Sequence, residues 1–239
     1  MFIYSIVILA DLLQRQSVWR GGAPIATGAR ATPTGYAALD IEFPGGGWPA
    51  GGLVELLCRG EGMGEMQLVL PALAALTAAG HRVAWLAPPH LPYAPALRAA
   101  GVRLERLTVV RAPGRRDTLW AAEQALRANA FQALLTWLPQ ASYAELRRLA
   151  VTAQGGSGFV LVFRPLEAAC ESSPAVLRLS LEPSFESGVR PLAVRILKRR
   201  GSPMNRPLHI PIKRPVHALG RAPFPAAQAA SAVARACVA

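Results

Sequence analysis

The chain has 239 residues, 52% of them apolar, which suits one globular domain with flexible ends. Twenty-six Lys and Arg residues against 14 Asp and Glu residues give a net charge of +12, so acidic partners such as nucleic acid, an anionic membrane or an acidic protein are favoured. Three widely spaced cysteines without a CxxC pair and four histidines without ligand spacing predict no metal site and a reducing, cytoplasmic setting.

An apolar run from Phe2 to Ala10 opens the sequence. No Lys or Arg precedes it and no small-residue cleavage site follows, which argues against a signal peptide. Asp11 and Arg15 interrupt it well short of the roughly 20 apolar residues that a membrane span needs. We therefore expect no membrane segment. Residues 1–20 are predicted to form a helical segment that docks on a partner or on a second copy of the chain, and residues 21–35 a Gly- and Pro-rich linker.

The stretch 36–217 alternates strand-like and helix-like patterns. This order predicts an α/β domain with a mostly parallel sheet and helices on both faces. Two later strands with no helix between them predict a C-terminal antiparallel hairpin, and the Ala- and Pro-rich residues 218–239 predict a disordered tail. Strands are expected at 53–57, 83–86, 107–111, 133–138, 159–163, 176–181 and 192–198, and helices at 65–79, 93–100, 118–128 after an Asp117 cap, and 142–154 after a Ser142 cap.

The first strand leads through a glycine-rich turn into a helix, which is the context of a phosphate-binding P-loop. Such a loop needs Gly-x-x-x-x-Gly-Lys-Ser/Thr, in which the Lys neutralises phosphate charge and the hydroxyl binds Mg²⁺. Here a carboxylate stands at the Lys position and a thioether at the hydroxyl position, and Arg59 replaces the first glycine. The degenerate loop consists of Gly60, Gly62, Gly64, Glu65 and Met66.

Two further catalytic elements of a nucleotidase are also missing. Thr136 and Trp137 stand where a metal-positioning Asp would end the strand, and residues 87–90 stand where a catalytic Glu would follow the second strand. The sequence therefore predicts a protein that is not an enzyme and has no cofactor, with the glycines kept for the tight turn. The alternative is a weak ATPase that takes a lysine from elsewhere in the chain.

Residues 34–56 resemble the approach to the P-loop in RecA-family recombinases, so a RecA-like core is expected. The pattern is more similar to ImuA, a RecA-like family of bacterial mutagenesis cassettes. The features that carry this resemblance are Val18-Trp19-Arg20-Gly21, Gly45-Gly46-Gly47-Trp48-Pro49, residues 88–97, residues 119–127 and Leu197-Lys198-Arg199-Arg200-Gly201.

The resemblance implies a non-catalytic accessory protein of damage-induced mutagenesis, acting in the SOS response and in translesion DNA synthesis. It also implies binding to ImuB, a polymerase-like protein, and to RecA. The alternative is a cell-division inhibitor similar to SulA, another RecA-like chain without nucleotide chemistry, which binds the division GTPase FtsZ.

Two sets of surface residues are candidates for contact with partners. A basic group near the predicted hairpin would bind nucleic-acid phosphates without reading sequence, or would simply be a solvated strand end. It comprises Lys198, Arg199, Arg200, Arg206, Lys213 and Arg214. Trp19 and Trp48 lie in turn-rich segments and are candidates for a partner-binding face, whereas Trp85, Trp120 and Trp137 are expected in the core or in the lining of a pocket.

Overall fold

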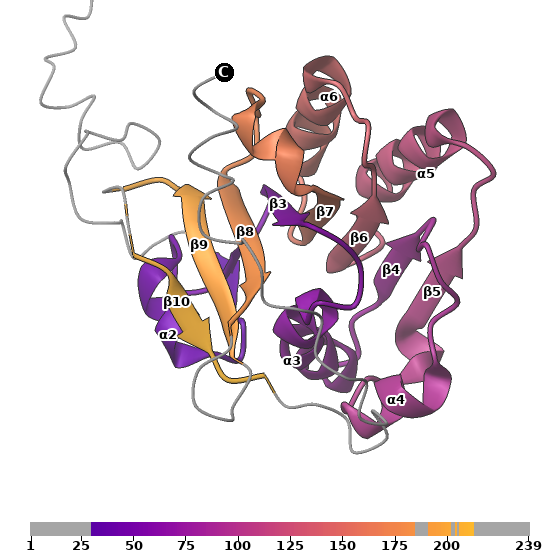
Figure 1. Ribbon diagram of the computed structural model, residues 1–239. Helices are drawn as coiled ribbons and strands as arrows, with labels where there is room; N and C mark the ends of the chain where they lie inside the picture. Colours follow the sequence, from indigo (N-terminus) through magenta and orange to yellow (C-terminus); the bar gives the residue numbers. More distant parts are fainter. Residues whose placement is uncertain (1–29, 185–190, 202–203, 205, 213–239) are drawn as a thin grey trace, which may run out of the picture.

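The computed structural model describes residues 30–184, 191–201, 204 and 206–212, and forms an eight-stranded sheet with helices on both faces (Figure 1). In chain order the elements are β1 (Ala31–Thr32), α2 (Ala37–Glu42), β2 (Trp48–Pro49), β3 (Leu53–Cys58), α3 (Glu65–Ala78), β4 (Val83–Leu86), α4 (Ala94–Ala99), η1 (Leu104–Arg106), β5 (Leu107–Val110), α5 (Arg115–Arg127), β6 (Ala133–Trp137), α6 (Tyr143–Ala153), β7 (Phe159–Pro165), η2 (Leu166–Cys170), β8 (Leu177–Pro183), β9 (Leu192–Lys198) and β10 (Leu208–Ile210).

The order of the strands in the sheet is β10-β9-β8-β3-β7-β6-β4-β5. All neighbours from β8 to β5 are parallel, and β9 and β10 add antiparallel pairs at one end. The predicted α/β class, RecA-like core and C-terminal antiparallel hairpin are thus confirmed. Because parallel strands end at one edge of a sheet, the turns after β3, β4 and β6 lie along the same edge, where ligands of such sheets bind.

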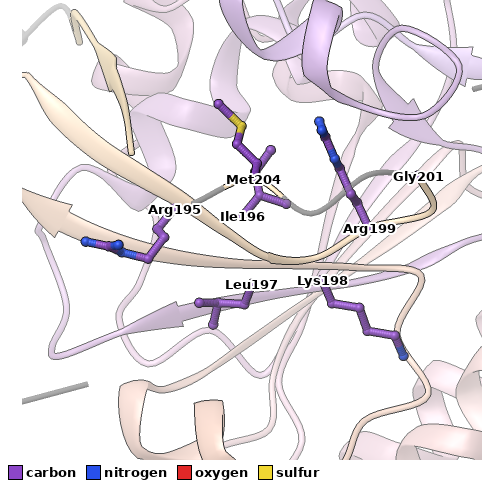
Figure 2. Close-up of a pocket in the computed structure, with 7 residues that line it drawn as sticks. All are labelled: Arg195, Ile196, Leu197, Lys198, Arg199, Gly201 and Met204. Carbon is purple, nitrogen blue, oxygen red and sulfur yellow. The ribbon is translucent and has the colours of Figure 1, made fainter. Parts of the chain in front are cut away.

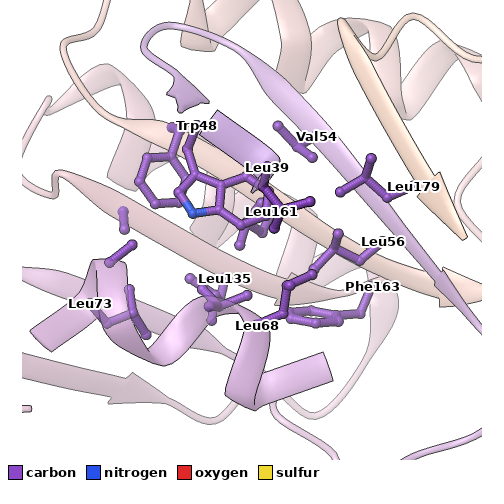
Figure 3. Close-up of a cluster of buried hydrophobic side chains, with 14 of the residues drawn as sticks. Leu39, Trp48, Val54, Leu56, Leu68, Leu73, Leu135, Leu161, Phe163 and Leu179 are labelled. Atoms are coloured by element: carbon purple, nitrogen blue, oxygen red, sulfur yellow. The ribbon is translucent and has the colours of Figure 1, made fainter. Parts of the chain in front are cut away.

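Each face of the sheet has its own apolar core. One face packs against α2, α3 and α4 through residues such as Leu39, Leu68 and Leu97, and Figure 3 shows Leu68 beside the ring of Phe163 on this side. The other face packs against α5 and α6, which contribute the buried side chains of Leu119 and Leu146, respectively. The nearly continuous apolar strands follow from this two-sided burial.

Short elements near the start of the domain differ from the sequence-based expectation. Residues 31–35 were expected in the linker, but β1 pairs with β2, and Thr34 is fully buried with its N–H donated to Asp40. The α5 helix begins at Arg115 and has Gly114 as its N-cap, so the predicted Asp117 cap is wrong. The predicted Ser142 cap is confirmed, because its hydroxyl accepts from the N–H of Glu145 in a capping box.

A buried ion cluster joins the centre of the sheet. Glu55 of β3 is fully buried, and its carboxylate accepts from Arg164 of β7 at 3.0 Å and from Nε of Arg178 of β8. Arg164 also donates to Glu171 at 2.7 Å, so two acids balance two bases. Arg178 donates in addition to the Ala168 carbonyl in η2. The cluster therefore ties three strands and η2 together around one carboxylate.

We predict that Glu55→Ala lowers the free energy of unfolding by about 3–5 kcal/mol, because it leaves two buried guanidinium groups without their common partner. Urea denaturation of the full chain measures this change. The matched control is Glu167→Ala, which removes an exposed carboxylate from η2 and is expected to cost less than about 0.5 kcal/mol. Equal losses in the two variants would contradict a special role for the cluster.

Candidate functional site

The glycine-rich turn after β3 keeps the geometry of an anion-binding loop but holds its own anion. Glu65, the first residue of α3, is only 8% exposed. Its carboxylate accepts the backbone N–H of Gly62 at 2.8 Å and that of Gly64 at 3.0 Å. Backbone N–H groups at a helix N-terminus are the donors that hold phosphate in a P-loop. Here they point at a side chain of the protein itself.

Packing closes the turn from outside. Gly64 has φ = +114°, a conformation that side chains rarely adopt, and a Cβ atom there would lie 2.6 Å from Cδ1 of Ile212. Ile212 and Leu192 thus lie against the turn from the antiparallel end of the sheet. The predicted loop residues Gly62, Gly64 and Glu65 are brought together, and Met66 packs against the core.

Aromatic side chains stand where catalytic groups of a nucleotidase are expected. Trp137 at the end of β6 stacks on Phe163 with ring centroids 4.6 Å apart, and its edge meets Trp85 at 6.0 Å. Thr136, at the position of the metal-binding Asp, is fully buried in the sheet. Lys198, one of the two lysines in the sequence, donates to the Ser173 carbonyl at 2.8 Å. It is therefore engaged away from the turn.

An exposed apolar surface lies beside the other end of this edge, and we call it the β4–β5 rim. It consists of residues 88–91, Tyr93 and Val109, with Leu91 72% and Tyr93 68% exposed. A cavity of about 310 Å³ opens there, lined by Leu91, Val109 and the neighbouring Arg111. In the described sheet β5 is the last strand, so its outer edge carries backbone groups not paired with another described strand.

The same rim contains a strained backbone conformation at Ala87 and a contact between His90 and Glu61. Ala87 directly follows β4 and has φ = +48°, and its N–H donates to the Val110 carbonyl at 2.8 Å. Such a conformation costs a non-glycine residue roughly 1–2 kcal/mol and is found most often at functional sites. His90 pairs with Glu61 of the glycine turn at 2.5 Å, which joins the two features. The sequence analysis did not predict this surface. The exposed residues Thr108 and Val109 lie on β5, the edge strand of the sheet.

The predicted basic group does not converge on one point. Arg195, Lys198 and Arg199 line a hollow of about 420 Å³ beside β9, but Figure 2 shows their side chains pointing in different directions. Arg199 donates to Glu42 at 2.7 Å, so its charge is balanced there. Arg200 and Arg206 are exposed, and Lys213 and Arg214 lie outside the described residues. Contact with nucleic acid through this group stays a prediction.

The tryptophans fall into different environments. Trp48 is fully buried between Phe43 and Phe159, with ring centroids 5.4 and 5.9 Å away, so it belongs to the core and presents no surface to a partner. Trp120 was expected in the core or in the lining of a pocket, but it is 65% exposed on α5. Trp19, like residues 1–20 as a whole, lies outside the described residues.

Within the described parts of the chain, no group of three or more His, Cys, Asp or Glu side chains is placed to hold a metal ion. Among those same residues, the helices are all too short or too polar to cross a membrane.

Comparison with known proteins identifies the family. The family described as "Cell division inhibitor SulA" matches residues 51–159, from the end of the β2 turn to the start of β7. The SulA of Edwardsiella piscicida is 32% identical over 120 residues, which cover 50% of this chain and 71% of that relative. The chain belongs to the SulA cell division inhibitor family.

Two further SulA proteins show the same relation at a greater distance. Those of Yersinia pestis (strain Pestoides F) and Yersinia pseudotuberculosis (serotype O:1b, strain IP 31758) are each 29% identical over 100 residues. The match covers 42% of this chain and 60% of each relative. Both the glycine turn and the β4–β5 rim lie inside the segment that matches the SulA family.

Membership of the SulA family corrects the resemblance to ImuA. The expected assignment to ImuA, the role in translesion synthesis and the binding of ImuB and RecA are wrong, because the family match and the relatives all name SulA. The residues that suggested ImuA include Trp48 and Leu119, which are buried in the core of the fold. The alternative interpretation, a SulA-like division inhibitor, is the one that the comparisons support.

Burial and the nearby Glu65 carboxylate raise the pKa of the Cys58 thiol from 9.0 to about 12. We therefore predict that at pH 8 its thiolate fraction is about a thousandfold smaller than in the unfolded chain, since three pKa units separate the two states. Alkylation at pH 8, followed by peptide mapping of Cys58 in the folded and urea-unfolded protein, measures this difference. A reaction rate in the folded protein that matches the unfolded rate would contradict the burial of this thiol.

Proposed function

We propose that this protein inhibits cell division in response to DNA damage by binding FtsZ, and that it does so in the cytoplasm without nucleotide chemistry. The family supports division inhibition, since the relatives are described as cell division inhibitors. The observation that carries the mode of action is the β4–β5 rim, where exposed apolar side chains and an edge strand lie within the matched segment.

The β4–β5 rim has the properties of a protein-docking surface. Leu91 and Val109 are exposed and line one cavity, with Tyr93 exposed close by in the sequence, and the cavity gives a partner side chain a place to enter. Arg111 is exposed and lines the same cavity, so an acidic group of the partner is favoured there. The outer edge of β5 offers main-chain hydrogen bonds as well.

The same positions that led us to expect no nucleotide chemistry from the sequence support this part of the proposal in the structure. Glu65 fills the donors of the turn, and Trp137 and Phe163 stack at the edge where a nucleotide and its metal would lie. A partner that binds the rim is therefore expected to be recognised by shape and charge alone, with no dependence on ATP.

Sedimentation of purified FtsZ polymers in GTP tests the function. We predict that the full chain, added in equal amount, lowers the polymer recovered in the pellet and that ATP leaves this effect unchanged. Undiminished polymer at saturating protein would refute FtsZ as the target. Cell filamentation on expression in a rod-shaped bacterium would then have to arise through another division protein.

The location of the docking surface is tested separately. We predict that Leu91→Glu combined with Val109→Lys weakens inhibition at least about tenfold, or 1.4 kcal/mol in binding free energy, because charges replace the apolar contacts. The matched control is Val151→Glu, which adds a charge at a half-exposed position on α6. Full inhibition by the double variant would place the docking surface elsewhere and leave division inhibition itself intact.

A further inference from the structure

Two backbone N–H groups of the glycine turn converge on one anion, and that anion is a side chain of the protein itself. Gly62 and Gly64 donate to two different oxygens of one carboxylate, at 2.8 and 3.0 Å. That carboxylate belongs to the first residue of a helix of 14 residues, where the helix dipole favours negative charge. Glu65 is more than nine-tenths buried, and its bond to Gly64 is buried as well, so water competes little for that bond, whereas Gly62 lies at the surface.

We propose that Glu65 is a built-in replacement for a bound phosphate, which keeps the turn in its ligand-bound shape with no nucleotide present. The position that holds the phosphate-binding Lys in a P-loop thereby carries the anion itself. A phosphate would bring negative charge and oxygen acceptors to these N–H groups, and the Glu65 carboxylate supplies both. An ammonium at this position would have no phosphate to neutralise and would repel the donors of the turn.

The glycine turn contacts two other parts of the fold. Ile212 and Leu192 pack against Gly64, which connects the turn to the antiparallel end of the sheet. Glu61, on the opposite side of the turn, pairs with His90 on the β4–β5 rim. In nucleotide-dependent switches, segments near the phosphate site are ordered by the bound γ-phosphate and released after hydrolysis. In this chain the Glu65 carboxylate is covalently attached, so its bonds to the turn do not depend on a nucleotide.

Thermal unfolding of the full chain, with and without inorganic phosphate, tests this proposal. Glu65→Ala is expected to lower Tm by about 2–4 °C, because the turn loses its charge-assisted cap. Added phosphate is expected to restore at least about half of that loss, because the vacated donors bind it. The native protein and Glu61→Ala, which removes an exposed acid from the same turn, are expected to show no comparable rise with phosphate.

Each other result overturns the proposal. An unchanged Tm in Glu65→Ala would show that the carboxylate does not hold the turn. A lowered Tm that phosphate fails to raise would reduce Glu65 to an ordinary helix cap. An equal rise with phosphate in the native protein would mean that the anion binds elsewhere on the basic surface.

A measurement on the native chain covers the case in which Glu65→Ala does not fold. Amide hydrogen exchange is expected to show Gly62 and Gly64 protected in phosphate-free buffer, since both N–H groups are bonded to Glu65. Glu65→Gln keeps the length of the side chain but not its charge, and it is expected to lose protection at one or both glycines. Exchange of both amides at the rate of an unstructured peptide in the native chain would refute the internal anion.

Discussion

The carboxylate of Glu55 is the interaction on which the architecture depends. It lies in the middle of an otherwise apolar strand with no exposure to water, where an unpaired charge would be prohibitively costly. Only a strand order that places β7 and β8 on either side of β3 brings both Arg164 and Arg178 to it. Apolar packing alone would tolerate other neighbours for β3. The ion cluster therefore specifies the centre of the sheet as well as holding it together.

The same principle operates at the edge of the sheet, with a different result. Glu65 lies among backbone N–H groups rather than guanidinium groups, and it satisfies donors that the end of α3 would otherwise leave unpaired. At the same edge of the sheet Trp137 stacks on Phe163. Internal partners therefore occupy the positions at which a P-loop protein has a phosphate ligand and a metal-binding Asp.

Sequence patterns predicted the helices with clear local signals and the strands that are buried on both faces of the sheet. The bounds of β4 and β9 agree with the predicted strands because buried apolar runs mark them clearly. The pairing of β1 with β2 and the burial of Trp48 escaped prediction, because such short segments are held by tertiary contacts and their turn-rich sequence suggests a surface. The ion cluster around Glu55 was not predicted, because Arg178 lies 123 residues away in the chain and reaches Glu55 only through the order of the strands.

For the candidate site, the sequence showed which nucleotide-binding residues are absent, but it did not reveal the exposed β4–β5 rim. Glu65 was evident at the Lys position, but its bonds to Gly62 and Gly64 depend on how the turn folds back on the helix. Some of the residues that suggested ImuA, such as Trp48 and Leu119, are buried and carry the fold, which does not identify a partner. What distinguishes such proteins is which side chains remain exposed after folding. Leu91 and Val109 can be recognised as neighbours only once β5 is known to be the edge strand, because 17 intervening residues separate them in the chain.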